Sequence, residues 1–342
     1  MKKRQAFLST VLAIVLASTM SMTAKADVYR SELTNEPINA ALQAQRPIAV
    51  MVDNEKTALA HYGVNKADIV YEMMNSTANG RITRLMCVVK DWKNLTQFGS
   101  IRSARPTNFM VAAEYNAILV HDGGPFYINP YVAAPYTNNL SGGFARFSNG
   151  KRTEFTEYVT SNGYKNPTTG KSYAGLNARI ARAGYSETYN QFYQGKHFQF
   201  SDAEFTLDAL GGAAATQVLL PFPHNGSQLH YNATTRTYDY YEYGSAHIDA
   251  LDGTVTTFKN VILQNCPYQI YDPNGYMVYN VVGSGNGFYL TNGKAIPINW
   301  TKTTDNDITR FTLADGTPLT LNTGKTYVGI VPADVWCSMV VK

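Results

Sequence analysis

The chain has 342 residues, of which 44% are hydrophobic, 12% aromatic and 16% charged, and its formal net charge is +4 at pH 7. This composition excludes an intrinsically disordered protein, because a disordered chain lacks the apolar residues that a core requires. The length exceeds what one hydrophobic core usually holds and predicts two domains.

The first 26 residues show the three zones of a secretory signal peptide. Residues 2–4 are basic, residues 6–20 are mostly apolar, and Ala24-Lys25-Ala26 supplies the small residues that signal peptidase requires. We therefore expect cleavage near Ala26 and a secreted or cell-envelope-associated protein. No later segment is long and apolar enough to cross a bilayer, so we expect no transmembrane segment after cleavage.

The leader also accounts for the charge of the whole chain. Its four basic residues and no acidic ones carry all of the net charge of +4, so the mature chain is neutral. A neutral protein has no overall field that would draw it onto nucleic acid. We therefore expect no nucleic-acid partner.

Residues 27–45 are predicted to be a polar spacer, and residues 46–210 an α/β domain. Continuous apolar runs predict strands at 48–52, 82–89 and 117–120. Helical spacing predicts helices at 67–74, 106–116, 154–160 and 176–183. Strands that alternate with helices favour a mixed or mostly parallel sheet.

The glycine- and alanine-rich residues 211–217 are the predicted linker, and residues 218–342 form a smaller, mostly antiparallel β domain. The short β-type runs lie at 218–220, 238–243, 255–263, 276–282 and 326–331. Turn dipeptides such as Asp252-Gly253 and Asn292-Gly293 separate them, as is typical of tight hairpins.

The cysteines and histidines point to no metal or cofactor. Cys87 lies in an apolar run and is expected to be buried, whereas Cys266 and Cys337 either pair or stay free. The histidines lack the spacing of a helical zinc site, and no pair of C-x-x-C motifs is present. We interpret His247 and Asp249 as a surface pair.

Polar residues gather where the predicted strands of the α/β domain end. The first strand ends at Asp53-Asn54, the third at His121-Asp122-Gly123, and the segment before the second helix carries two arginines. Loops at strand ends form the binding sites of α/β sheets, and arginines beside a helix start suit a carboxylate or phosphate. The predicted ligand-binding residues are Asp53, Asn54, Glu72, Arg84, Arg102, Ser103, Arg105, His121 and Gly123.

Three functions are compatible with this pattern. The first is a non-enzymatic protein that binds an anionic cell-wall fragment, or an envelope protein, in a cleft of the α/β domain. The second is a hydrolase or transferase acting on the cell wall, with His121 as general base and Asp53 or Asp122 orienting it. The third is an interaction scaffold that contacts a protein through its tyrosine-rich β domain. Structural pairing of Arg102 and Arg105 with Asp53 and Glu72 would also explain the charges.

The same segments resemble the YerB-like family of predicted bacterial lipoproteins, a domain family of unknown function. The resemblance implies an N-terminal α/β domain, a smaller C-terminal domain and an exported, envelope-associated protein, but no established activity. The segments that carry it are 46–54, 67–72, 82–84, 101–106, 121–124, 260–264, 309–311 and 330–332.

The chain departs from the family pattern at three places. Leu59-Ala60-His61-Tyr62-Gly63 replaces an Arg-Pro-Gln-Ser-Gly stretch, and a longer loop at 75–80 replaces a segment that usually carries a glutamate. The lipid-accepting cysteine is absent. These departures remove part of the charge that the family places near the site, and the resemblance does not extend to a lipid anchor.

Overall fold

The structure is a computed structural model that describes residues 28–342. The predicted leader and its cleavage site lie outside the described residues. Among the helices of residues 28–342, none is long and apolar enough to span a membrane.

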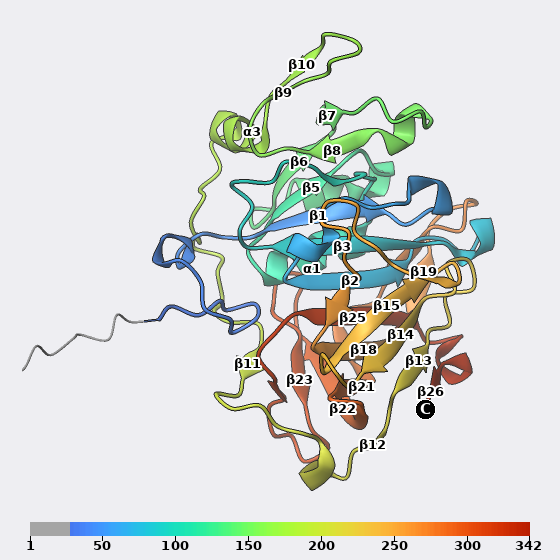
Figure 1. Ribbon diagram of the computed structural model, residues 1–342. Helices are drawn as coiled ribbons and strands as arrows, with labels where there is room; N and C mark the ends of the chain where they lie inside the picture. Colours follow the sequence, from blue (N-terminus) through green and yellow to red (C-terminus); the bar gives the residue numbers. More distant parts are fainter. Residues whose placement is uncertain (1–27) are drawn as a thin grey trace, which may run out of the picture.

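One mixed sheet of eleven strands runs through the whole molecule (Figure 1). Its strands in order are β12 (Ala213–Ala214), β22 (Lys294–Lys302), β21 (Gly283–Thr291), β18 (Asn260–Cys266), β25 (Thr326–Pro332), β2 (Ile69–Met74), β3 (Thr83–Val89), β1 (Ile48–Asp53), β5 (Ile118–His121) and β6 (Asn138–Ser141), and β23 (Arg310–Thr312) pairs with β22.

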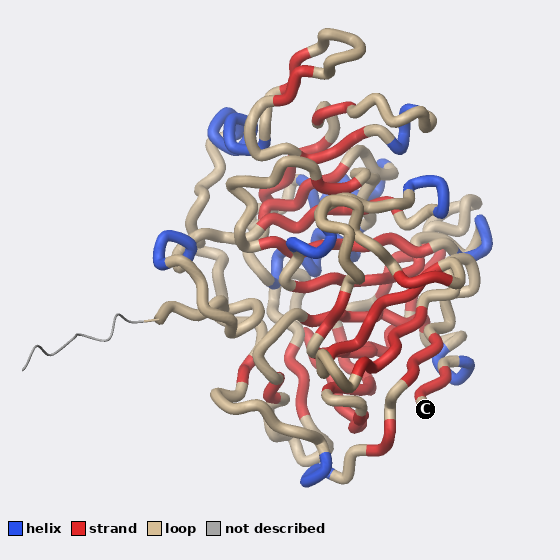
Figure 2. Tube along the Cα trace, in the orientation of Figure 1, coloured by secondary structure: helices blue, strands red, loops and turns tan. Residues whose placement is uncertain are grey.

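The N-terminal strands form the mixed sheet that the sequence predicts. β1 is antiparallel to β3 and parallel to β5, and β5 is parallel to β6. All six residues of β1 are buried, as expected for a continuous apolar run covered on both faces. Figure 2 shows how few helices accompany these strands. They are α1 (Pro106–Glu114), α2 (Asn129–Val132) and α3 (Leu176–Ala183).

The second sheet belongs to the C-terminal part and is antiparallel throughout, as predicted. Its strands are β16 (Ser245–Ala246), β15 (Thr237–Glu242), β14 (Gln228–Asn232), β13 (Gln217–Leu219), β26 (Val340–Val341) and β17 (Thr257–Phe258). Smaller sheets consist of β4 (Phe98–Gly99), β8 (Glu157–Val159) and β7 (Ala145–Arg146), of β9 (Tyr164–Lys165) and β10 (Ser172–Tyr173), of β11 (Gln199–Phe200) and β24 (Thr320–Leu321), and of β19 (Tyr268–Ile270) and β20 (Met277–Tyr279).

Short 3-10 helices fill the connections between the strands. They are η1 (Ala40–Leu42), η2 (Lys56–Ala58), η3 (Val64–Lys66), η4 (Asn79–Arg81), η5 (Phe126–Ile128), η6 (Thr153–Phe155), η7 (Asp208–Leu210) and η8 (Trp336–Ser338).

Strand β25 joins the two parts of the chain. It lies between β2 and β18 and is parallel to both, so a C-terminal strand completes the N-terminal sheet. The N-terminal residues 28–45 also pack onto the body, where Leu33 is buried and Glu32 pairs with Lys90 at 2.7 Å. The boundaries of the two parts at residues 210 and 218 stay a prediction.

Two predicted helices are wrong. Residues 69–74 form strand β2, buried along its whole length, because Ile69, Val70 and Tyr71 pack on both faces of the sheet. Residues 157–159 form strand β8 after the 3-10 helix η6. The hydrophobic pattern of a short apolar run is compatible with either a helix or a strand. In both segments, packing against the rest of the protein favours the strand. Cys266 and Cys337, whose pairing the sequence leaves open, are both free, and Cys87 is buried as expected.

Glu114, the last residue of α1, ties this helix to the C-terminal part. Its carboxylate accepts hydrogen bonds from Lys302 Nζ at 2.9 Å, from the Thr309 amide at 2.9 Å and from His197 at 2.6 Å. Burial opposes ionisation, but Lys302 and His197 outweigh it and hold the pKa of Glu114 at about 2. A carboxyl group with a lowered pKa stabilises the fold above its unfolded-state pKa, and this stabilisation is lost as the pH falls.

We predict that Glu114→Gln lowers the free energy of unfolding at pH 7 by about 3–5 kcal/mol, because Lys302 is left buried without its counter-charge. The unfolding free energy of the variant should also fall less steeply than that of the wild type between pH 4.5 and 2. Urea unfolding across this pH range measures both effects. The control is Glu187→Gln, which removes an exposed ion pair with Lys93. Equal pH slopes in wild type and Glu114→Gln would contradict the prediction.

Candidate functional site

Three loops meet at the carboxyl end of β1. The Arg102 amide donates to the Met51 carbonyl at 3.0 Å, and the Asp122 amide donates to the Arg102 carbonyl at 3.1 Å. The Ala104 amide donates to the Gly123 carbonyl at 3.1 Å. The segment before α1 is therefore held between the ends of β1 and β5, which are parallel and so end at the same edge of the sheet.

Gly124 allows the close approach of these loops. A Cβ atom there would lie 2.4 Å from Ile128 Cδ1 and 3.0 Å from the Ala104 carbonyl oxygen. A side chain at position 124 would therefore clash with its neighbours. Its absence lets the backbone of residues 121–124 pack directly against the residues before α1.

The arginine cluster consists of Arg84, Arg102 and Arg105. Arg102 Nε lies 2.9 Å from Asp53 Oδ2. Arg84 and Arg105 both donate to Ser103 Oγ, at 3.0 and 3.3 Å. The predicted residues Asp53, Arg84, Arg102, Ser103 and Arg105 thus lie together.

This cluster holds more positive charge than its neighbours neutralise. Asp53 is the carboxylate that forms an ion pair with it among residues 28–342. Burial and the neighbouring Arg105 lower the pKa of Arg84 to about 9, and burial lowers the pKa of Arg105. Arg105 Nε is buried and, within the described chain, has no hydrogen-bond partner. A buried cationic donor without a partner is costly, so the cluster favours an anion.

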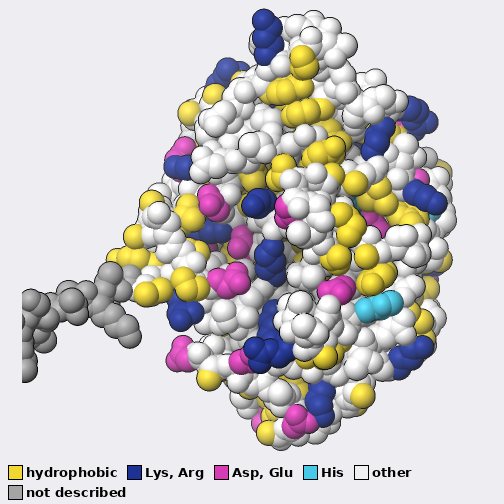
Figure 3. Space-filling model, viewed as in Figure 1, with side chains coloured by type: hydrophobic (Ala, Val, Ile, Leu, Met, Phe, Trp, Pro, Cys, Tyr) yellow, Lys and Arg dark blue, Asp and Glu magenta, His cyan; other side chains and the backbone are white. Residues whose placement is uncertain are grey.

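The excess charge is local. On the face shown in Figure 3, basic and acidic side chains are interspersed, and no broad field of one sign covers the coloured residues. A ligand drawn to the arginine cluster would therefore respond to a few guanidinium groups at short range.

One small cavity adjoins the cluster, and a larger one lies near it. A cavity of 10 Å³ lies behind Arg84 and Arg105, which is room for about one water molecule. The second is an aromatic hollow of 600 Å³ lined by Phe126, Tyr127, Asn129, Pro130, Tyr131, Tyr136, Tyr271 and Asp305.

Tyr127 and Tyr276 connect the aromatic hollow to the arginine cluster. The guanidinium of Arg105 lies 4.0 Å from the centre of the Tyr276 ring. The Tyr127 ring centre lies 5.2 Å from that of Tyr271, and its hydroxyl donates to Asp272 at 3.3 Å. Burial and the nearby Asp272 carboxylate raise the pKa of Tyr127 to about 12, and the charge of Arg105 partly opposes this rise. The aromatic hollow therefore lies near Arg105, which does not itself line it.

His121 does not fit the role of a general base. Its ring is 1% exposed, Nδ1 lies 2.8 Å from the Gly123 carbonyl oxygen, and Nε2 lies 3.1 Å from Asn139 Nδ2. No hydrogen bond joins His121 to Asp53 or Asp122 among the described residues. The backbone of residues 121–123 reaches the site as predicted, but the His121 side chain turns into the core against Phe109.

Glu72 and Asn54 lie in the interior and not at the arginine cluster. Glu72 accepts hydrogen bonds from hydroxyl groups at 2.6–3.0 Å, and Asn54 Nδ2 lies 3.4 Å from it. Burial raises the pKa of Glu72, and the hydroxyl donors partly oppose this rise. The donors are Thr83, Ser227, Tyr240 and Tyr327, so Glu72 joins the two sheets and has a structural role.

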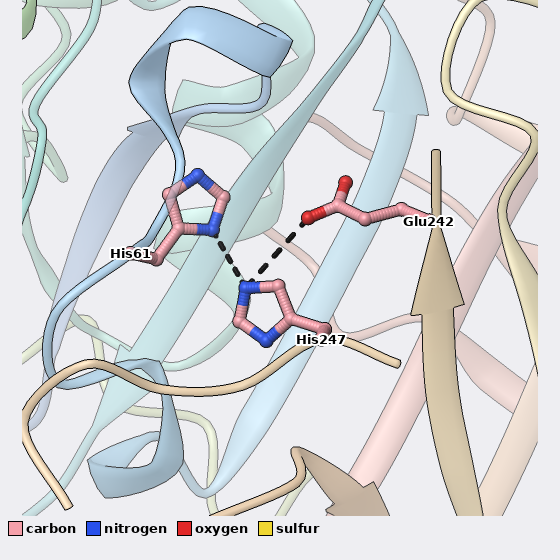
Figure 4. A group of neighbouring side chains, drawn as sticks. All are labelled: His61, Glu242 and His247. Atoms are coloured by element: carbon pink, nitrogen blue, oxygen red, sulfur yellow. Dashed lines mark hydrogen bonds and ion pairs between the residues drawn. The ribbon is translucent and has the colours of Figure 1, made fainter. Parts of the chain in front are cut away.

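A second group of polar side chains is one that the sequence analysis missed. His61, Glu242 and His247 are all buried and point toward one another, as Figure 4 shows. His61 Nδ1 lies 2.9 Å from His247 Nε2, which lies 3.7 Å from Glu242 Oε1. The predicted surface pair of His247 and Asp249 is wrong, because both are buried. No sequence motif could have revealed this group, because His61 and His247 lie 186 residues apart in the chain.

Two family descriptions match this chain, one after the other. Residues 33–186 match "Protein of unknown function (DUF3048) N-terminal domain", and residues 218–328 match the corresponding C-terminal domain. Neither description gives an activity.

The chain is also similar to a protein of Bacillus subtilis (strain 168) described as "Putative lipoprotein YerB". The two are 24% identical over 307 residues, which cover 89% of this chain and 86% of the other. The crystal structure of YerB from Bacillus subtilis superimposes with a TM-score of 0.74 at 20% identity, over 92% of this chain and 99% of the other. At this identity the likeness shows the fold alone.

We predict that Asp53→Asn lowers the free energy of unfolding by about 1–2 kcal/mol, because it removes the counter-charge of Arg102 while keeping the shape of the side chain. The estimate is modest because Arg102 is partly exposed to solvent. Urea unfolding at pH 7 measures it. The control is Asp91→Asn, since the exposed Asp91 side chain makes no hydrogen bond or ion pair with residues 28–342. Equal changes in both variants would contradict the prediction.

Proposed function

Because the chain belongs to the DUF3048 family, whose function is unknown, its role has to be argued from the site, and we propose that it binds an anionic ligand. The ligand's charged group would lie at the arginine cluster. The proposed setting is the cell envelope after export, which the leader-like start and the similarity to a protein described as a lipoprotein both support.

One observation carries this proposal: three guanidinium groups lie together, and among residues 28–342 only that of Arg102 forms an ion pair with a carboxylate. Guanidinium forks bind carboxylate and phosphate groups through paired hydrogen bonds. Arg102 is half-buried and reaches solvent, whereas Arg105 is 5% exposed and keeps an unpaired buried donor within the described structure. An anion at this place would offset the repulsion and accept the free hydrogen bonds.

The aromatic hollow narrows the class of ligand. Tyrosine and phenylalanine rings offer flat apolar faces with polar edges, which suit the ring of a sugar or of another flat ligand. Because Tyr127 of the hollow lies near Arg105, a ligand with a ring and an acidic group would be able to contact both. Fragments of the bacterial cell wall that carry carboxylates have this chemistry.

We favour binding over catalysis. The enzyme hypothesis depended on His121, and that side chain is buried against a backbone carbonyl and an amide. Among the described residues, the arginine cluster contains no other histidine that could act as a general base.

We predict that inorganic phosphate and N-acetylmuramic acid each raise the melting temperature of the wild-type protein, and that Arg102→Ala and Arg105→Ala abolish both shifts. Each substitution removes a guanidinium that would bind the anion, and binding to the folded state alone raises its stability. Thermal unfolding with increasing ligand measures the effect. The control is Arg236→Ala, at an exposed arginine paired with Glu204.

Unchanged shifts in both cluster variants would reject the arginine cluster as the site. Arg105 is buried, so its variant could unfold, and the half-exposed Arg102 then decides the question. Loss of the shift in Arg236→Ala as well would indicate binding to general surface charge and would equally reject the site.

The exposed rings also support a second candidate function, the docking of an envelope protein. Phe126 is 81% exposed, Ile270 56% and Tyr271 48%, and exposed apolar groups that cluster mark interaction surfaces. A protein partner would cover these side chains without needing the arginines.

We predict that Tyr271→Ala weakens the binding of N-acetylmuramic acid about tenfold and leaves phosphate binding unchanged, because only the sugar acid has a ring to stack there. Isothermal titration with both ligands measures this. The control is Tyr241→Phe, at a tyrosine of β15 in the second sheet. Equal affinities for N-acetylmuramic acid in wild type and Tyr271→Ala would show that the sugar ring does not bind in the aromatic hollow. The exposed aromatic side chains would then be better explained by the docking of a protein.

A further inference from the structure

The group of His61, Glu242 and His247 is brought together by a tight hairpin and a loop. Glu242 ends β15 and His247 follows β16, and Tyr243 and Gly244 between them both have positive φ, at 50° and 79°. Such a two-residue turn matches the twist of the strands and reverses the chain direction, so that β16 pairs with β15. His61 comes from the segment between η2 and η3 and lies against the hairpin (Figure 4).

The hydrogen bonds of His61 fix its tautomer. Nε2 lies 2.7 Å from the backbone carbonyl oxygen of Asp53, which can only accept, so Nε2 carries the proton. The other ring nitrogen, Nδ1, is then a free lone pair when the ring is neutral. It faces His247.

A chain of hydrogen bonds fixes His247 in the same way. Asn65 Nδ2 donates to Asp252 and Thr254, so Asn65 Oδ1 faces Thr256 and accepts from its hydroxyl at 2.6 Å. The Thr256 hydroxyl therefore accepts from His247 Nδ1 at 2.8 Å. His247 Nε2 is left as a lone pair.

Two lone pairs thus face each other at 2.9 Å, beside a carboxylate. Such an arrangement is repulsive unless a cation or a proton lies between the nitrogens.

Glu242 supplies the negative charge. Neither of its carboxylate oxygens accepts a hydrogen bond within the described structure, although the side chains of Asn54, Asn225 and Tyr240 lie nearby. The three ligand atoms lie within 4.8 Å of one another.

We propose that His61, His247 and Glu242 form a binding site for a divalent transition metal, with Zn²⁺ as the ion that suits it best. Two imidazole nitrogens and one carboxylate oxygen are a familiar zinc ligand set, whereas Mg²⁺ and Ca²⁺ prefer oxygen ligands alone. Both imidazoles already donate their other N–H to an oxygen, as metal-bound histidines do.

The surroundings leave room for a further ligand. A pocket of 330 Å³ opens beside the group and is lined by both Glu242 and His247. Three protein ligands and an open fourth position are typical of zinc sites that bind water or a substrate group. This site uses none of the arginines, so it stands apart from the proposed anion binding.

The test uses Co²⁺ as a spectroscopic substitute for Zn²⁺, with protein made without a polyhistidine tag and stripped by chelation. We expect saturation at one Co²⁺ per chain, with the strong visible absorption of a four-coordinate ion, and its loss when Zn²⁺ is added. Glu242→Gln and His247→Ala should abolish this signal. Thr256→Val, which removes the oxygen that orients His247, should weaken binding about 10–100-fold.

The matched control is His230→Ala, because His230 is half-buried on β14 and stacks on Tyr241 away from the group. It should bind Co²⁺ as the wild type does. The proposal is overturned by wild-type protein that does not saturate at one Co²⁺ per chain, or by a signal that persists in Glu242→Gln. Loss of the signal in His230→Ala would place the ion elsewhere and overturn it too. Should His247→Ala not fold, the isosteric Glu242→Gln decides.

Discussion

The insertion of β25 between β2 and β18 is the constraint on which the rest of the structure depends. All seven of its residues are buried, and its two neighbours are parallel to it, so neither half of the large sheet is complete without the other part of the chain. Tyr327 of β25 donates to Glu72 of β2, which also receives the hydroxyls of Ser227 and Tyr240 from the second sheet. Covering the sheet and placing the site loops are therefore parts of the same folding event.

Buried charge is handled in two different ways in this molecule, and the difference separates structure from function. Glu72 and Glu114 are buried, and each is surrounded by donors that satisfy it. Arg105 and Glu242 are also buried, yet each keeps polar atoms without a partner in the described chain. A fold gains no stability from such atoms, since each forfeits its bonds to water. Unpaired buried atoms occur elsewhere in the described chain as well, so at these two places it is their position beside other charged groups that suggests a missing ligand.

The sequence predicted the features that depend on local pattern. The apolar runs of β1, β3 and β5, the proline-led helix α1 and the meeting of the loops at 53 and 102 all follow from residue order. It failed where the outcome depends on distant packing. Residues 69–74 became a strand because β25 and β3 flank them, and His121 turned inward because Asn139 and Phe109 receive it. His61 and His247 lie 186 residues apart in the chain, so their approach leaves no trace in spacing.

Asp53 links the two candidate sites and also keeps them separable. Its carboxylate pairs with Arg102, while its backbone carbonyl accepts a hydrogen bond from His61 Nε2. A change to the side chain acts on the arginine cluster and leaves the histidine's acceptor in place, whereas a shift of the strand end would move both. This short stretch of backbone is one direct path for coupling between an anion at one site and a cation at the other. Since such coupling is reciprocal, each ligand would change the affinity for the other by the same factor.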